Sequence, residues 1–333
     1  MRKNKKKMFT ESLTFLIILL LLLLSLNSIY YNTNLRYYRP NVLDTQLYVN
    51  KDNIKIVFFG DCQTQTAINT SYIYRSFNFA SPDENYALTY YKLLKLLNDG
   101  FDLDIVVLPI DLNAFYYKKA KVWELFEYLP WYWGRYLSYS DIYHMKDDAS
   151  FTELVSWEIE SRFPFIGQGE ELVEFWQYTS TERNEKLNKD FVIGFLVLDG
   201  RLSSQDTNFV TNKANDFVKN IFDEKSIFNE ELFLYFRKTL DLAEKHGLKT
   251  VLLKSPITKE YFDASKEYFD IDQYYDKIFN LTDQYNDIYV LDYQDKYFGE
   301  YFMFYDVARL NTQGAKVFSE QVNEDFKKLY LTD

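Results

Sequence analysis

The chain has 333 residues, enough for one large domain or two modest ones, and 47% of them are hydrophobic, with 30 tyrosines and 29 phenylalanines. This composition excludes a disordered chain and supplies a large core. Outside the first eleven residues, 33 Lys and Arg stand against 48 Asp and Glu, a net charge of −15, which predicts no binding to nucleic acid. The single cysteine excludes an internal disulfide.

The N-terminus carries a membrane signal. Most of residues 2–7 are basic, and an apolar run follows at residues 13–26. The basic flank predicts a cytoplasmic tail at 1–11 and a single transmembrane signal anchor at 12–31, with the main domain outside the cytoplasm at the cell membrane. A cleaved signal peptide is the alternative, because the run is short for a span, but no good cleavage site follows it. Residues 32–53 are predicted to be a polar stalk.

Residues 54–110 predict a strand, a helix and a second strand. The apolar run at 54–59 ends in Gly60-Asp61, typical of a buried parallel strand that enters a turn. The motif Ser81-Pro82-Asp83-Glu84 has the form of a capping box, and it predicts a helix of about 16 residues that ends near Gly100. The next strand is predicted at 104–110. This order and spacing indicate a right-handed parallel crossover.

Residues 112–230 interrupt the alternation and are rich in tryptophan and in acidic helical patterns, so they predict a largely helical insertion. The insertion either caps a site or consists of ordinary packing helices. After residue 230 the pattern predicts a helix to 247, a strand at 250–254, a helix near 272–284, a strand at 288–291 and a last helix from 312 to about 330. The predicted fold class is therefore α/β: one three-layer domain at 54–333 with a central parallel sheet.

Functional groups of such sheets gather in the loops at the carboxyl ends of the strands. Cys62, Asp111, Ser255 and Asp292 are all predicted to lie there. Cys62 follows a strand and precedes a predicted helix, where backbone N–H groups and the helix dipole favour a thiolate and stabilise an oxyanion. The alternative is that Cys62 is simply a small buried apolar residue.

Two motifs at opposite ends of this domain resemble a known family. They are Gly60-Asp61-Cys62 and Asp306-Val307-Ala308-Arg309. They are similar to the first and last blocks of the SGNH/GDSL hydrolase superfamily, G-D-S and D-x-x-H, with Cys62 in place of the serine and Arg309 in place of the histidine. The likeness covers about residues 54–110 and 232–328. It implies a flavodoxin-like fold and acyl-ester chemistry, that is, hydrolysis or transfer of a small acyl group.

The resemblance also implies roles for individual residues. Cys62, Asp306 and Arg309 occupy the catalytic positions, and Cys62 would form a thioester. The oxyanion or substrate-binding positions fall on Gly60, Asp61, Gln63, Asn78, Ala80 and Asp111, with the backbone N–H groups of Cys62 and Ala80 as donors. The segment at 254–261 resembles the membrane-anchored branch of the superfamily, which includes the D-alanyl transfer protein of lipoteichoic acid synthesis and exopolysaccharide acetylation proteins.

The general base is the group that these motifs do not supply. Arg309 stays protonated at physiological pH, so it cannot act as a base. It can pair with Asp306, bind an anion or hold Cys62 as a thiolate. The chain has two histidines. His246 is predicted to end a helix as a partner of its dipole, whereas His144 belongs to the insertion and could reach the site from there.

Two functions follow as hypotheses. In the first, an anchored protein transfers or removes an acyl group on cell-envelope polysaccharide, with a glycan or an acyl donor as ligand and a membrane-bound O-acyltransferase as partner. In the second, a catalytically inactive homologue binds glycan or scaffolds an acylation complex, because loss of the base costs orders of magnitude in rate and aromatic side chains stack on sugar rings. A third, an esterase for small soluble substrates, fits the anchor least. No His/Cys cluster, phosphate-binding glycine loop or dinucleotide fingerprint occurs, so neither metal nor cofactor is predicted.

Overall fold

A computed structural model gives the fold of most of the chain. The structure describes residues 2–33, 39–82, 84–116, 133–137, 141, 150–164, 191–192, 194–202, 207–222 and 228–331. The chain divides into two units. The first contains Met1–Val42 and Trp123–Leu187, and the second contains Leu43–Val122 and Asn188–Asp333.

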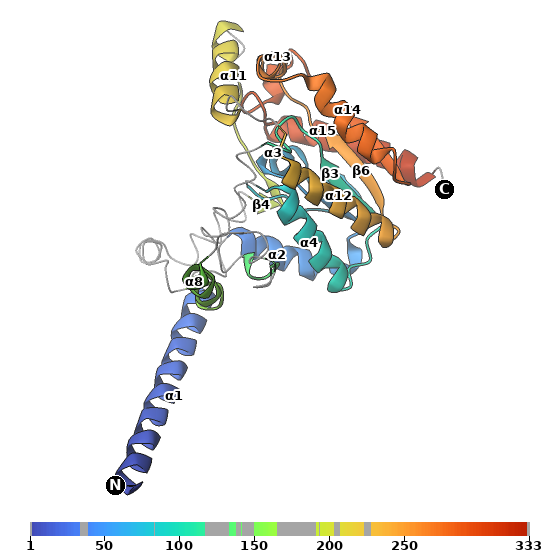
Figure 1. The fold of residues 1–333 in the computed structure, drawn as a ribbon. Coiled ribbons are helices and arrows are strands. Elements are labelled where there is room, and N and C mark those ends of the chain that lie inside the picture. The colour runs from blue at the N-terminus through green and yellow to red at the C-terminus, as the bar shows by residue number, and fades with distance from the viewer. Residues whose placement is uncertain are drawn as a thin grey trace. The chain divides into compact units, whose positions relative to one another are not determined.

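The first unit begins with helix α1 (Arg2–Thr33), which is drawn in dark blue in Figure 1. Its stretch Met8–Asn32 has a mean hydropathy of 2.4, and most of its side chains are exposed. By length and composition this helix can cross a membrane, and the predicted span at 12–31 lies within it. The same unit contains α8 (Phe151–Arg162), which Ser150 and Glu153 begin with a capping box and which buries Leu154 and Trp157.

Helix α2 (Arg39–Val49) lies in the segment predicted to be a polar stalk. Leu43 and Leu47 of this helix are buried in the second unit, which begins at Leu43. They are one helical turn apart, so they lie on the same face of the helix. A short 3-10 helix, η2 (Lys51–Asn53), then leads into the sheet. The second half of the predicted stalk is therefore part of the folded unit. Leu43 and Leu47, one helical turn apart, were the sequence feature that indicated a buried helix face.

The second unit is built on a five-stranded parallel sheet. Its strands are β1 (Ile56–Phe58), β2 (Ser76–Asn78), β3 (Ile105–Pro109), β6 (Lys249–Lys254) and β7 (Ile288–Asp292), in the order β2-β1-β3-β6-β7. One row across the sheet pairs Asn78, Phe58, Val107, Val251 and Tyr289. The predicted α/β class with a central parallel sheet is confirmed. Strand β2 was not predicted, because three residues with a single apolar side chain give no strand pattern.

Helices pack on both faces of this sheet (Figure 1). On one face α4 (Tyr86–Asn98) and α12 (Glu230–Lys245) lie side by side, with Tyr91 against Tyr235. Helix α14 (Ile271–Thr282) joins α12 through an ion pair between Lys277 and Glu230. On the other face α15 (Thr312–Leu331) packs Phe326 against Phe58 of β1.

Helix α4 begins four residues later than the capping-box motif predicts. Its N-cap is Asn85, whose side chain accepts a hydrogen bond from the backbone N–H of Leu88 at 3.1 Å. Ser81 and Glu84 do bond to each other, with 3.0 Å between Ser81 Oγ and Glu84 Oε2, but they lie outside the helix. The prediction of the helix start was wrong because Glu84 is not a solvent-facing cap and instead points into the core.

The last part of the predicted insertion folds with the second unit. It contains a two-stranded antiparallel hairpin, β4 (Phe191–Val192) and β5 (Phe195–Leu196), and helix α11 (Thr207–Ile221). The hairpin turn lies against β2: a Cβ atom on Gly194 would be 1.8 Å from the backbone oxygen of Asn78. Helix α11 packs Phe217 against Tyr261 of α13 (Lys259–Ser265).

Candidate functional site

Strand β1 ends in a sharp turn that presents Cys62. Gly60 has a φ of +133°, and a Cβ atom there would lie 2.4 Å from Thr64 Oγ1 and 2.8 Å from Pro109 Cγ, so glycine is required. Asp61 then caps α3 (Cys62–Ala67), because its Oδ1 accepts the backbone N–H of Gln63 at 2.8 Å. Cys62 is the first residue of this helix and is partly exposed.

The loop before α15 holds Asp306 and Arg309 as one unit. Asp306 Oδ2 accepts hydrogen bonds from Arg309 Nε at 2.7 Å and Nη2 at 2.6 Å. Asp306 Oδ1 accepts the backbone N–H groups of Arg309 and Ala308 at 2.8 and 3.0 Å. Both carboxylate oxygens are therefore engaged within the loop, and neither is positioned to orient a separate base.

Arg309 also acts on Cys62. Burial works to lower the pKa of Arg309, but the hydrogen bond and charge of Asp306 outweigh it, and the negative charge of the Cys62 thiolate raises the pKa further. The interaction is mutual, so Arg309 favours the thiolate form of Cys62. Of the roles predicted for Arg309, pairing with Asp306 is confirmed, and holding Cys62 as a thiolate stays a prediction.

The structure places His246 away from this site. His246 is the C-cap of α12 and precedes β6, so it lies at the amino end of the sheet, opposite the edge that carries Cys62. Its predicted place at a helix end is confirmed. His144 lies outside the described residues. Within the described part of the chain, no histidine stands beside Cys62.

Tyr261 is a site residue that the sequence did not single out. Its phenol is buried, and its pKa is raised, first by that burial and then by the charges of Asp111, Asp61, Cys62 and Asp306. Charges from the loops after β1 and β3 and from the loop before α15 therefore all act on this one buried hydroxyl. In a chain with 30 tyrosines, nothing in the sequence marks this one.

Asp111 ties the ends of two strands together. Its Oδ1 accepts the backbone N–H of Ser255 at 2.7 Å, and its Oδ2 accepts the Ser255 hydroxyl at 3.1 Å. The Tyr274 hydroxyl donates to the Asp111 backbone oxygen at 2.8 Å. Asp292, predicted at the same edge, is half-exposed and pairs with Lys254 at 2.8 Å.

The residues predicted to stabilise an oxyanion are buried, and they differ in whether their N–H groups already have a hydrogen-bond partner. Asn78 donates to the backbone oxygens of Ile68 at 2.8 Å and Thr64 at 3.1 Å, and its Oδ1 accepts the Ala80 N–H at 3.2 Å. The Ala80 N–H is therefore already hydrogen-bonded to Asn78. Its role as an oxyanion donor stays a prediction, and that role would require this hydrogen bond to break. By contrast, the buried Gln63 Nε2 has no hydrogen-bond partner among the described residues.

Beneath the turn lies a fully buried ion pair that the sequence motifs did not indicate. Lys92 Nζ is 2.6 Å from Glu84 Oε2, and neither side chain is exposed. Lys92 also donates to the backbone oxygen of Phe79 and to Ser81 Oγ, both at 2.9 Å, while Glu84 Oε1 accepts the Gly60 N–H at 3.4 Å. The pair thus connects α4 to the turn before Cys62. Its signal was the place of Lys92 on the apolar face of α4.

No protein-family model matches this chain, and no curated protein matches its sequence. The described residues contain no group of three His, Cys, Asp or Glu side chains placed to hold a metal ion. The candidate site combines the partly exposed Cys62 thiol, the Arg309–Asp306 pair and the buried Tyr261 phenol.

Proposed function

We propose that the chain is a membrane-anchored SGNH-like protein that acts on cell-envelope polysaccharide, with Cys62 as the acceptor of a small acyl group. The sheet order β2-β1-β3-β6-β7 corresponds to the flavodoxin-like order 2-1-3-4-5, and Cys62 follows its first strand. The basic residues at the start of α1 favour an orientation with the second unit outside the cytoplasm. The glycan is the acyl acceptor or donor, and a membrane-bound O-acyltransferase is the partner.

The observation that carries this proposal is Arg309 beside a partly exposed Cys62. A thiolate is a strong nucleophile and depends less on a base than a serine hydroxyl does. The thiolate attacks the acyl carbonyl, the S–C bond forms, and the ester C–O bond breaks, so that the alcohol leaves with a proton from water. A polysaccharide hydroxyl then attacks the thioester, the C–S bond breaks, and the hydroxyl proton passes to solvent.

A second function is favoured by the engagement of Asp306. Both of its oxygens are held by Arg309 and by the backbone of the loop, and the described residues place no histidine at the site. An acceptor hydroxyl would then lack a base to activate it. In this case the protein is a catalytically inactive glycan-binding or scaffold component of an acylation complex.

The experiment that separates the two is acetylation of Cys62. The purified full-length protein in detergent micelles is incubated with p-nitrophenyl acetate, and its intact mass is compared with that of Cys62→Ala. A single acetyl group present only in the wild type supports the acyl-acceptor function. Equal labelling of the two proteins, or none, refutes it and leaves the binding function. Because Cys62 is partly exposed and alanine is close to it in size, the variant should unfold at nearly the same temperature, which checks that the fold is intact.

A further inference from the structure

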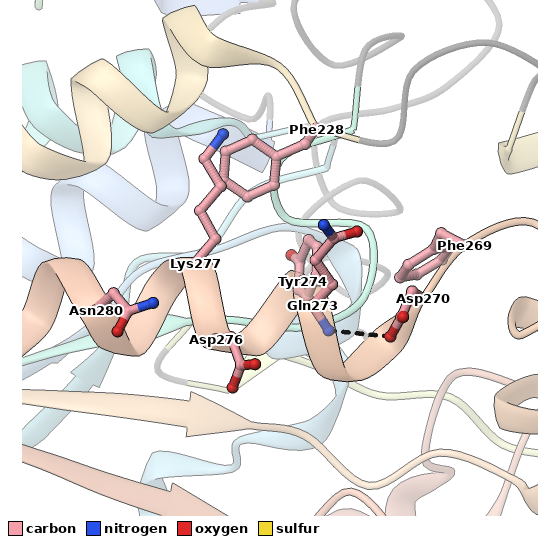
Figure 2. Close-up of a pocket in the computed structure, with 8 residues that line it drawn as sticks. All are labelled: Phe228, Phe269, Asp270, Gln273, Tyr274, Asp276, Lys277 and Asn280. Atoms are coloured by element: carbon pink, nitrogen blue, oxygen red, sulfur yellow. Dashed lines mark hydrogen bonds between the residues drawn. The ribbon is translucent and has the colours of Figure 1, made fainter.

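A groove of about 560 Å³ runs along α14, within the second unit (Figure 2). This volume is in the range of small-molecule sites, roughly 300–1,000 Å³. Helix α14 begins at the carboxyl edge of the sheet, and Tyr274 links the groove to Asp111 of the candidate site through the hydroxyl bond at 2.8 Å. The groove thus begins at the edge of the sheet that carries Cys62.

Aromatic rings form the apolar part of this groove. Phe228 and Phe269 are half-exposed, and their ring centroids lie 5.8 and 5.7 Å from that of the buried Tyr274. Phe228 also stacks on Phe115 at 5.1 Å. Since these rings are packed against one another, they offer a fixed apolar surface, which the C–H face of a sugar ring can cover.

Polar side chains from one face of α14 form the rim. Gln273, Asp276 and Asn280 are spaced at i, i+3 and i+7, and all three are exposed. Within the described part of the chain, their side chains make no hydrogen bond. Amides both donate and accept, and a carboxylate accepts, so this rim matches the hydroxyl groups of a sugar.

The charge of the rim selects among sugars. Asp270 and Asp276 contribute two carboxylates, whereas Lys277 is already paired with Glu230 and stacked over the Phe228 ring at 3.8 Å. A uronic acid or a phosphorylated sugar would meet like charge, which disfavours binding. A neutral sugar or one that carries an amine meets no such repulsion.

We propose that this groove is a saccharide-binding subsite for sugars without acidic groups. The choice of ligand class rests on the proposed function in polysaccharide modification. The apolar surface takes the ring face, and the amides of Gln273 and Asn280 hold the hydroxyl groups. The subsite keeps a glycan chain at the edge of the sheet where Cys62 lies.

The test uses the full-length protein in detergent micelles and isothermal titration with three probes: a chitin oligosaccharide, its deacetylated glucosamine oligomer and an oligogalacturonate. We expect binding of one or both of the first two and none of the third. The double variant Gln273→Ala/Asn280→Ala should weaken binding by about tenfold or more, because two hydrogen bonds are lost. Asp272→Ala, exposed on the same helix but outside the groove, should bind as the wild type does.

Three results would overturn the subsite: no binding of any probe, preferred binding of the oligogalacturonate, or equal binding by the double variant. Acetylation of Cys62 is measured on the same samples. A double variant that loses the sugar but keeps the acetyl adduct supports the groove independently of the cysteine chemistry. Retained sugar binding without any adduct in the wild type refutes the acyl-acceptor function alone.

Discussion

Replacing Lys92 with methionine is expected to lower the free energy of unfolding by about 3–5 kcal/mol, the usual cost of breaking a buried ion pair. Methionine fills nearly the same volume, so the cost comes from the charge that remains. Glu84 would keep a carboxylate with no exposure and without the ammonium at 2.6 Å. The backbone oxygen of Phe79 and Ser81 Oγ would each lose a donor at 2.9 Å. This loss is a large share of a typical stability of roughly 5–15 kcal/mol.

The assay is urea unfolding of the full-length protein in micelles, followed by circular dichroism. The matched control is Lys95→Met on the same helix, whose pair with Asp99 at 3.0 Å is 31% exposed on each side and should contribute no more than about 1 kcal/mol. The double variant Glu84→Gln/Lys92→Met should be more stable than Lys92→Met, because it removes the stranded charge. A Lys92→Met protein as stable as the Lys95→Met control would refute the reasoning.

Two further predictions concern the turn and its charge. Gly60→Ala should abolish or severely reduce folding, because the new Cβ atom would lie 2.4 Å from Thr64 Oγ1. The matched control is Gly247→Ala, where φ is +66° and no atom lies within 4 Å, so the variant should lose only about 1–2 kcal/mol through backbone strain. Thermal unfolding compares the two variants, and equal losses of stability would contradict the predicted clash at Gly60. Arg309→Met removes a positive charge that interacts with Cys62, so the midpoint of iodoacetamide alkylation should move to higher pH. An unchanged midpoint would show that Arg309 does not act on Cys62.

The sheet was largely predictable because four of its strands contain apolar runs bounded by polar or glycine residues, and β1, β3 and β6 are also buried. Strand β2 escaped because Ser76–Asn78 is held by partners far along the chain. Phe77 pairs with Val57, and the Asn78 amide donates to the backbone oxygen of Thr64 in α3. No short-range pattern contains these contacts, so only the folded chain shows the strand.

The candidate site also has a part that the sequence could predict and a part that it could not. Asp306 and Arg309 are three residues apart, so their pairing was open to local reasoning. Glu84 and Lys92 were harder to pair, because charged residues ordinarily indicate surface and the place of Lys92 on the apolar face of α4 names no partner. Their burial follows from the Gly60 turn, the end of β2 and the start of α4, which meet only in the folded state.

The loop around Asp306 has a consequence for how the site can change. Asp306 Oδ1 accepts two main-chain N–H groups, at positions 308 and 309, and these are present whatever side chain stands there. The shape of the loop and the charge it presents are therefore separable. Arg309 can therefore be replaced by histidine, glutamine or methionine while the backbone of the loop stays in place. The reactivity of Cys62 can be tuned there by single substitutions.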